Sequence, residues 1–233
     1  MAATATTTIR PSPARRIYGL GSVFGKTLRD SRRATIAVAL VLGLLLLGVT
    51  RAVSAEFSTV ASREQMAELI RSVPPILAGL AGRVVNVETL GGYVQYKYGS
   101  FFPLIVSLWS IIALSGTLAI EARRGSLEFL AATAMTRRQI ALEKLFAHIV
   151  AVTIAVAVIF VSIAIAGGAF AVLPGDAIGI DAAAGYAIWL GLVALAFGML
   201  AFAIAPFAIL ALMLISLQLM NVLLRSRAGR LKQ

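Results

Sequence analysis

The chain has 233 residues, of which 60% are hydrophobic and only 13% are charged, and its mean hydropathy is +0.93. A soluble domain is about half apolar and about a quarter charged, so this composition excludes an ordinary soluble protein and indicates one integral membrane domain. The net charge of +11 comes from basic residues beside the apolar runs, which indicates membrane topology and anionic lipid rather than a nucleic-acid partner.

The first 33 residues predict a short tail followed by a basic helix. Residues 1–16 are small, polar and interrupted by proline, so we expect them to be disordered. Apolar residues then recur at a spacing of three to four, which predicts a helix over residues 17–33 at the membrane surface. This helix would face lipid headgroups or an acidic partner with four basic residues, Lys26, Arg29, Arg32 and Arg33.

The stretch GLGSVFGKT, residues 19–27, ends like a phosphate-binding P-loop. Gly25, Lys26 and Thr27 fill the last three places of G-x-x-x-x-G-K-[ST], but the first glycine would fall at Leu20. The preceding residues also lack the hydrophobic strand that leads into a P-loop. We therefore expect this chain to bind no ATP itself.

Apolar stretches predict four membrane spans and a fifth candidate, within a membrane domain over residues 17–224. The four spans cover about residues 34–53, 101–120, 145–166 and 182–204. Residues 207–224 are apolar enough for a fifth span, and a basic tail follows over residues 225–233. A cleaved signal peptide is the alternative interpretation of the first span, because the residues VSA at 53–55 resemble a cleavage site.

Residues 54–100, between the first two spans, contain one clear helix signal. Ser62 and Gln65 have the spacing of a capping box, in which each side chain bonds the other residue's backbone. The helix that starts there would stop at Pro74 and Pro75. Tyrosines just before the second span are typical of the membrane–water interface.

The basic residues predict how the chain is oriented. They cluster in the N-terminal region and in the loop over residues 121–144, so we expect both in the cytoplasm and residues 54–100 and 167–181 outside. The C-terminus conflicts with this rule, since a fifth span would carry the basic tail outside. Three alternatives remain open: the fifth segment re-enters without crossing, the tail is an exception, or the chain is truncated.

The loop over residues 121–144 is rich in helix signals. Gly125 would break the second span's helix, and Ser126 can cap a new one with Glu128 in its first turn. Thr136 and Gln139 form a second capping box that would start the third span's helix. The sequence thus predicts a short helix across the cytoplasmic ends of two spans, suited to passing motion from a partner. The alternative is an ordinary connector packed on lipid headgroups.

This loop resembles the cytoplasmic signature of ABC-2-type transporter permeases, E-x-x-x-G-[ST]-L-E-x-L-L-x-x-P-[VIL]-[ST]-R-x-x-[IL]-x-x-x-K. The matching residues are Glu121, Gly125, Ser126, Leu127, Glu128, Leu130, Thr136, Arg137, Ile140 and Lys144. Ala131 and Ala134 depart from it, where the family commonly has leucine and proline. The segment FGKTLRDSRR before the first span also resembles the family's basic N-terminal helix.

The resemblance implies the permease subunit of an ABC exporter that moves a small apolar or amphiphilic substrate. ATP and Mg²⁺ would be held by a separate ATPase subunit, and a second permease half or a homodimer would complete the transporter. The short helix would be the coupling helix, with Leu127, Leu130 and Met135 as its apolar face. Polar contacts would come from Glu121, Glu128 and Arg137. Family permeases usually have six spans per half, so we also consider a truncated half.

The expected fold class is therefore an all-α integral membrane protein with four to five transmembrane helices, an N-terminal interfacial helix and a cytoplasmic coupling helix. We expect a multi-pass protein of the cell membrane with a cytoplasmic N-terminus. No enzyme activity, bound cofactor or metal is expected, since cysteine is absent and the only histidine, His148, suits packing. The alternative function is a non-transporting anchor or regulatory protein that docks a cytoplasmic partner.

Overall fold

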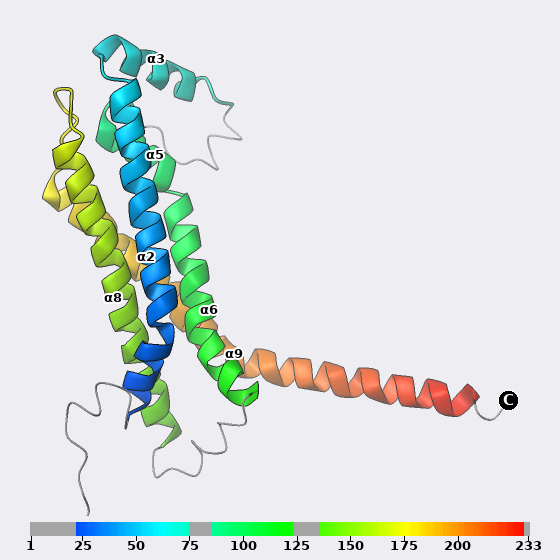
Figure 1. Ribbon diagram of the computed structural model, residues 1–233. Helices are drawn as coiled ribbons and strands as arrows, with labels where there is room; N and C mark the ends of the chain where they lie inside the picture. The colour runs from blue at the N-terminus through cyan, green and yellow to red at the C-terminus, as the bar shows by residue number, and fades with distance from the viewer. Residues whose placement is uncertain (1–21, 75–84, 124–135, 231–233) are drawn as a thin grey trace, which may run out of the picture.

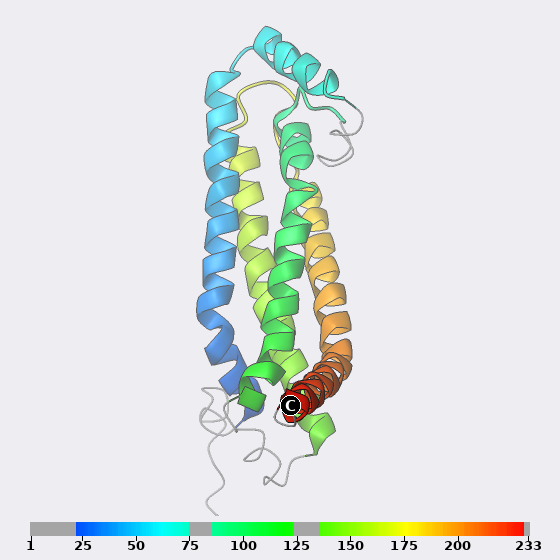
Figure 2. The ribbon, with the colours of Figure 1, turned by 90° about the vertical axis from the view of Figure 1, so that its right-hand side faces the viewer.

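The computed structural model describes residues 22–74, 85–123 and 136–230, and all regular structure in this part of the chain is helical (Figure 1). The tail predicted over residues 1–16 lies outside the described residues. Long helices run side by side, and short ones close one end (Figure 2). The helices are α2 (Val23–Glu56), α3 (Val60–Arg71), α5 (Leu90–Tyr98), α6 (Phe101–Arg123), α8 (Arg137–Ala169) and α9 (Ile180–Arg230).

Within the described ranges, three helices are long and apolar enough to cross a membrane. They are α2, the part of α8 over Arg138–Ala169 and the part of α9 over Ile180–Ala205. Helix α5 and the Phe101–Gly116 part of α6 make a fourth span if the two cross together, with a bend of 43° between them. The helices therefore agree with the prediction of an all-α membrane protein, and the described part of the chain holds three or four candidate spans.

In the described residues, the predicted basic helix and the predicted first span belong to one continuous helix, and no helix end marks the predicted boundary between residues 33 and 34. Helix α2 begins at Val23, with the Ser22 hydroxyl accepting a hydrogen bond from the Gly25 backbone N–H at 3.1 Å. It continues unbroken to Glu56 because no proline interrupts it and the hydroxyls of Ser31, Thr35 and Thr50 bond back to carbonyls of the same helix. The P-loop-like residues Gly25 to Thr27 therefore lie in the first turns of a helix.

Helix α9 likewise joins two segments that were predicted separately, residues 182–204 and 207–224. It continues through Pro206 and includes the predicted basic tail as far as Arg230. A proline inside a helix removes a backbone hydrogen bond and favours a kink without ending the helix. The C-terminal part, orange to red in Figure 1, leaves the bundle near the end where α2 begins. It does not run back along the other helices as a further span of the bundle.

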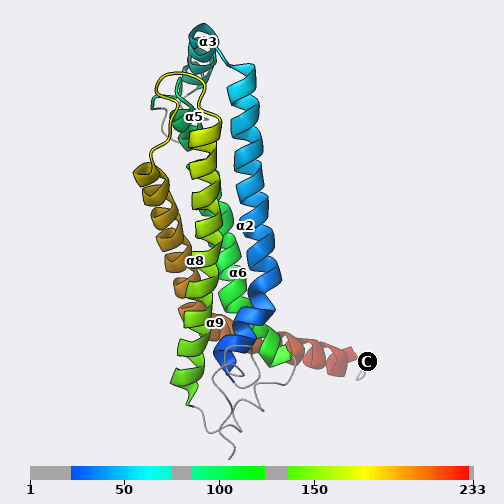
Figure 3. The same cartoon turned by 60° about the vertical axis from the view of Figure 1, so that its left-hand side comes forward.

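Helix α8 packs between α2 and α9, while α6 packs against α9 (Figure 3). Helices α2 and α8 approach closely at Gly43, where an added methyl would lie 2.7 Å from the Ser162 hydroxyl and 3.4 Å from the Val158 side chain. Small residues let helix backbones approach closely inside a membrane. Large apolar side chains face outward on the long helices. Leu44 of α2 and Leu192 of α9, for example, have 64% and 62% of their surface exposed. Such a surface suits contact with lipid.

Of the two predicted capping boxes, one is confirmed and one is wrong. The Thr136 hydroxyl and the Gln139 amide each accept the other residue's backbone N–H, at 3.2 and 2.9 Å, and α8 starts there. Helix α3 instead starts three residues earlier than predicted, since Thr59 is its cap and Ser62 completes the box at 3.2 Å in both directions. The physical reason is that Ser62 fits the third helical position as well as it fits a cap.

Candidate functional site

The two ends of the bundle differ in composition. Helices α2 and α8 begin at one end, where α6 also finishes; we call this the basic end (Figure 1). Helices α3 and α5 and the connection from α8 to α9 lie at the other, which we call the cap end. The predicted basic helix and the borders of the predicted coupling segment therefore share one end of the molecule. The predicted outside segments share the other.

Most of the predicted coupling residues cannot be placed. Glu121 lies in the last turn of α6, which extends to Arg123, and Arg137 is the first residue of α8. The predicted coupling segment therefore connects α6 to α8 at the basic end. Outside the described residues lie Gly125, Ser126, Leu127, Glu128, Leu130 and Met135.

The start of α8 is joined to the start of α2. The Phe24 backbone N–H donates a 2.9 Å hydrogen bond to the Glu143 carboxylate, across 119 residues of sequence. A carboxylate at the first turn of a helix also favours the helix dipole. The neighbouring Lys144 is fully buried, so the last matching residue of the predicted signature lies inside the bundle. Of the predicted basic residues, Lys26 is partly buried here.

The remaining predicted basic residues, Arg29, Arg32 and Arg33, lie exposed along α2. The Arg29 guanidinium is 3.8 Å from the Asp30 carboxylate in an exposed pair, which contributes little to stability. These side chains are therefore accessible to an anionic lipid or an acidic partner surface. The structure brings this basic surface and the coupling segment's attachment points to the same end of the molecule.

A buried polar pair lies one turn beyond Lys144 on α8. The His148 Nε2 atom is 2.7 Å from the Ser110 hydroxyl of α6, and both residues are buried. The Trp109 ring lies 5.8 Å from the imidazole ring. Gly198 of α9 packs directly against the Ser110 hydroxyl. The expected packing role of His148 therefore agrees with its position, but its partner Ser110, which lies 38 residues away, was not predicted from the sequence.

Replacing Gly198 by alanine is expected to destabilise the bundle by about 1–3 kcal/mol, because the added methyl would displace the Ser110 hydroxyl from its bond to His148. The measurement is the unfolding transition in detergent. Gly191→Ala is the control on the same helix, since its methyl would lie 3.5 Å from Val156, an ordinary contact. Equal stability of the two variants would show that the close approach at Gly198 is unimportant.

At the cap end a single carboxylate joins three segments. Asp176, in the connection before α9, pairs with Arg63 of α3 at 3.3 and 3.2 Å. It also accepts backbone N–H groups from Leu90 at 2.9 Å, from Leu173 at 3.1 Å and from Val172 at 3.3 Å. Arg63 and Asp176 are each 1% exposed. We call these five residues the Asp176 hub.

The hub was not predicted from the sequence. Arg63 lies between Ser62 and Gln65, the two residues of the predicted capping box, and Asp176 lies in the segment 167–181 that was predicted to be outside. The available signal was that Arg63 precedes Met66 and Ala67 by three and four positions, which puts an arginine on the buried face of α3. A cation on an apolar face requires a partner. The Asp176 hub joins helix α3 to the bundle at the cap end and is a structural site.

Comparison of the chain with protein-family models, with curated proteins and with solved structures found no match. A proposal for the function therefore depends on the signature of residues 121–144 and on the position of this segment at the basic end of the bundle. Among the described residues, no group of three or more histidine, aspartate or glutamate side chains could hold a metal ion.

Proposed function

We propose that this chain is the membrane-spanning permease subunit of an ABC exporter, moving a small apolar or amphiphilic substrate across the cell membrane. The observation that carries the proposal is the match of residues 121–144 to the ABC-2 permease signature. Support comes from position: this segment connects α6 with α8 at the basic end, beside the first turn of α2. The proposed orientation places that end and the N-terminus in the cytoplasm.

In this proposal the coupling segment transmits ATP-driven motion to the bundle. The ATPase subunit holds ATP and Mg²⁺, and Leu127, Leu130 and Met135 dock on it. Movement of the segment would pull directly on α6 and α8, because it is attached to both. The Phe24 to Glu143 hydrogen bond would carry the same movement into α2. A second permease half or a second copy of this chain would supply the other side of the transport path.

Binding of the ATPase is expected to fall about tenfold or more in Leu127→Asp and Leu130→Asp variants, since each puts a charge into an apolar contact. The measurement is a pull-down with ATPases encoded beside this chain. Val60→Asp is the control. Val60 is apolar like the two leucines, has 62% of its surface exposed, and lies at the cap end of the bundle. Unchanged binding by the two leucine variants would refute the coupling-segment assignment. The purified chain alone is expected neither to bind nor to hydrolyse ATP.

Reconstituted vesicles separate this proposal from the alternative of a non-transporting anchor. An exporter with its ATPase would move an amphiphilic fluorescent dye across the bilayer only when ATP is present. An anchor would bind the ATPase through the same residues and leave the dye where it was. Binding with no ATP-dependent movement would therefore favour the anchor.

A further inference from the structure

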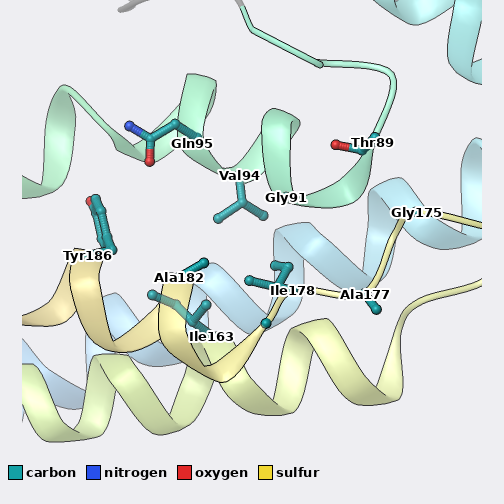
Figure 4. A pocket seen from close by; sticks show the side chains of 11 residues that line it. Thr89, Gly91, Val94, Gln95, Ile163, Gly175, Ala177, Ile178, Ala182 and Tyr186 are labelled. Atoms are coloured by element: carbon teal, nitrogen blue, oxygen red, sulfur yellow. The ribbon is translucent and has the colours of Figure 1, made fainter.

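A pocket of about 310 Å³ lies at the cap end, between α5, α8 and the start of α9 (Figure 4). This volume is at the lower end of the range of small-molecule sites. One wall comes from the connection that precedes α9, where Gly175 and Ala177 flank Asp176. The Asp176 hub therefore holds this wall against α5, so the pocket is built into the folded cap.

The body of the pocket is apolar. Val94 of α5, Ile163 of α8 and Ile178 of the connection line it (Figure 4). No aspartate, glutamate, lysine or arginine is among its lining residues. A charged ligand would lose its hydration there without gaining a counter-charge, which costs several kcal/mol by desolvation. The lining therefore selects an uncharged ligand.

Two polar side chains also line the pocket. Gln95 makes no hydrogen bond through its side chain in the described part of the chain, so its amide can both donate and accept. The Tyr186 hydroxyl donates to the Tyr98 carbonyl at 3.1 Å, which leaves its oxygen able to accept. A mainly apolar cavity with a few convergent polar groups is the usual form of a small-molecule site.

We propose that this pocket binds a small uncharged amphiphile, an apolar chain with one hydroxyl or amide group that bonds Gln95 and Tyr186. Binding itself does not depend on the proposed function. The further statement that such molecules are the exported substrate class does rest on it. Binding can be measured by thiol labelling of the chain without any ATPase. A negative result in that measurement is therefore distinguishable from failure of the coupling assignment.

The absence of cysteine provides a direct test, because Ala182→Cys puts the only thiol of the chain in the pocket lining. Octan-1-ol is expected to slow maleimide labelling of this thiol by about tenfold. The matched control is Gly185→Cys on the next turn of α9, which is exposed, does not line the pocket and has open space around an added side chain. Its labelling rate is expected to change less than twofold.

Further probes test the chemistry. Octane lacks a hydrogen-bonding group and octanoate is charged, so both are expected to protect Ala182→Cys about fivefold less well than octan-1-ol. Adding Gln95→Leu should remove the preference for octan-1-ol over octane, and Gln95 is exposed enough for this change to leave the fold intact. The proposal is wrong if octane protects as well as octan-1-ol does, or if both thiols are protected alike.

Two sources of such an amphiphile can be distinguished. Octan-1-ol added to the chain in lipid-free detergent tests a freely diffusing molecule. Dioleoylglycerol in nanodiscs tests a bilayer lipid, whose head is an uncharged hydroxyl. Protection of Ala182→Cys by either supports the binding site and names its source, whereas protection by neither refutes it.

Discussion

Replacing Asp176 by alanine is expected to detach α3 from the bundle, at a cost of about 3–5 kcal/mol. The variant leaves the Arg63 guanidinium buried without a counter-charge, since only its Nε bond to the Phe57 carbonyl, at 2.6 Å, remains. It also removes the acceptor of three backbone N–H groups, of which that of Leu90 is buried and those of Val172 and Leu173 are partly buried. The measurement is amide hydrogen exchange in α3 and in residues 170–179, where protection should be lost.

Removing both charges is not expected to restore stability. A simple buried ion pair can often be exchanged for apolar residues with little loss. In the Asp176 hub, however, the N–H groups of Leu90, Val172 and Leu173 would still lack their acceptor in an Arg63→Met, Asp176→Leu double variant. The buried N–H of Leu90 alone would cost about 1–3 kcal/mol. We therefore expect the double variant to remain at least as exchange-labile in this region as Asp176→Ala.

An exposed ion pair in the same region provides the control. The Arg71 guanidinium lies 2.8 Å from the Glu88 carboxylate, with side chains 55% and 39% exposed. Glu88→Ala is expected to cost at most about 1 kcal/mol, because water can replace the lost partner. If the amides of α3 are as well protected from exchange in Asp176→Ala as in Glu88→Ala, the Asp176 hub does not hold α3 on the bundle.

The sequence was sufficient to predict features that depend on local pattern. Long apolar runs predicted the membrane helices, and the run at residues 145–166 lies inside α8. The capping box at Thr136 was found because its partner, Gln139, lies only three residues away. The predicted boundaries after residues 33 and 204 rest on a change of composition, and no helix ends at either place. A continuous helix can carry basic, apolar and proline-containing stretches alike.

The polar interactions that join distant elements could not be predicted in the same way. Arg63 and Asp176 are separated by 113 residues, and the hydroxyl of Ser110 meets His148 only after α6 and α8 have packed. Such pairs depend on tertiary geometry, which no local spacing encodes. Inside an apolar bundle these few polar pairs still decide which helix faces meet, because an unpaired group there is costly.

Replacing Gly92 by alanine is expected to destabilise the cap end by about 3 kcal/mol. An added methyl would collide with the Asn86 carbonyl and lie 2.7 Å from the Val85 carbonyl oxygen, both backbone groups that cannot rotate away. Asn86 already has a left-handed backbone, with φ of 48°. The turn before α5 would have to move, and with it Leu90, whose N–H donates to the hub. The measurement is the unfolding transition in detergent, together with hydrogen exchange in α5.

The neighbouring Gly91→Ala is the matched control for this prediction. Its methyl would lie 3.5 Å from the Ile178 side chain, an ordinary contact, and both substitutions favour the helix to the same degree. Because Gly91 lines the pocket and Gly92 does not, the two variants should also separate folding from ligand binding. Gly91→Ala should keep the stability of the parent chain and change only octan-1-ol protection. If Gly92→Ala is as stable as Gly91→Ala, the turn at Asn86 tolerates displacement and does not hold α5 on the Asp176 hub.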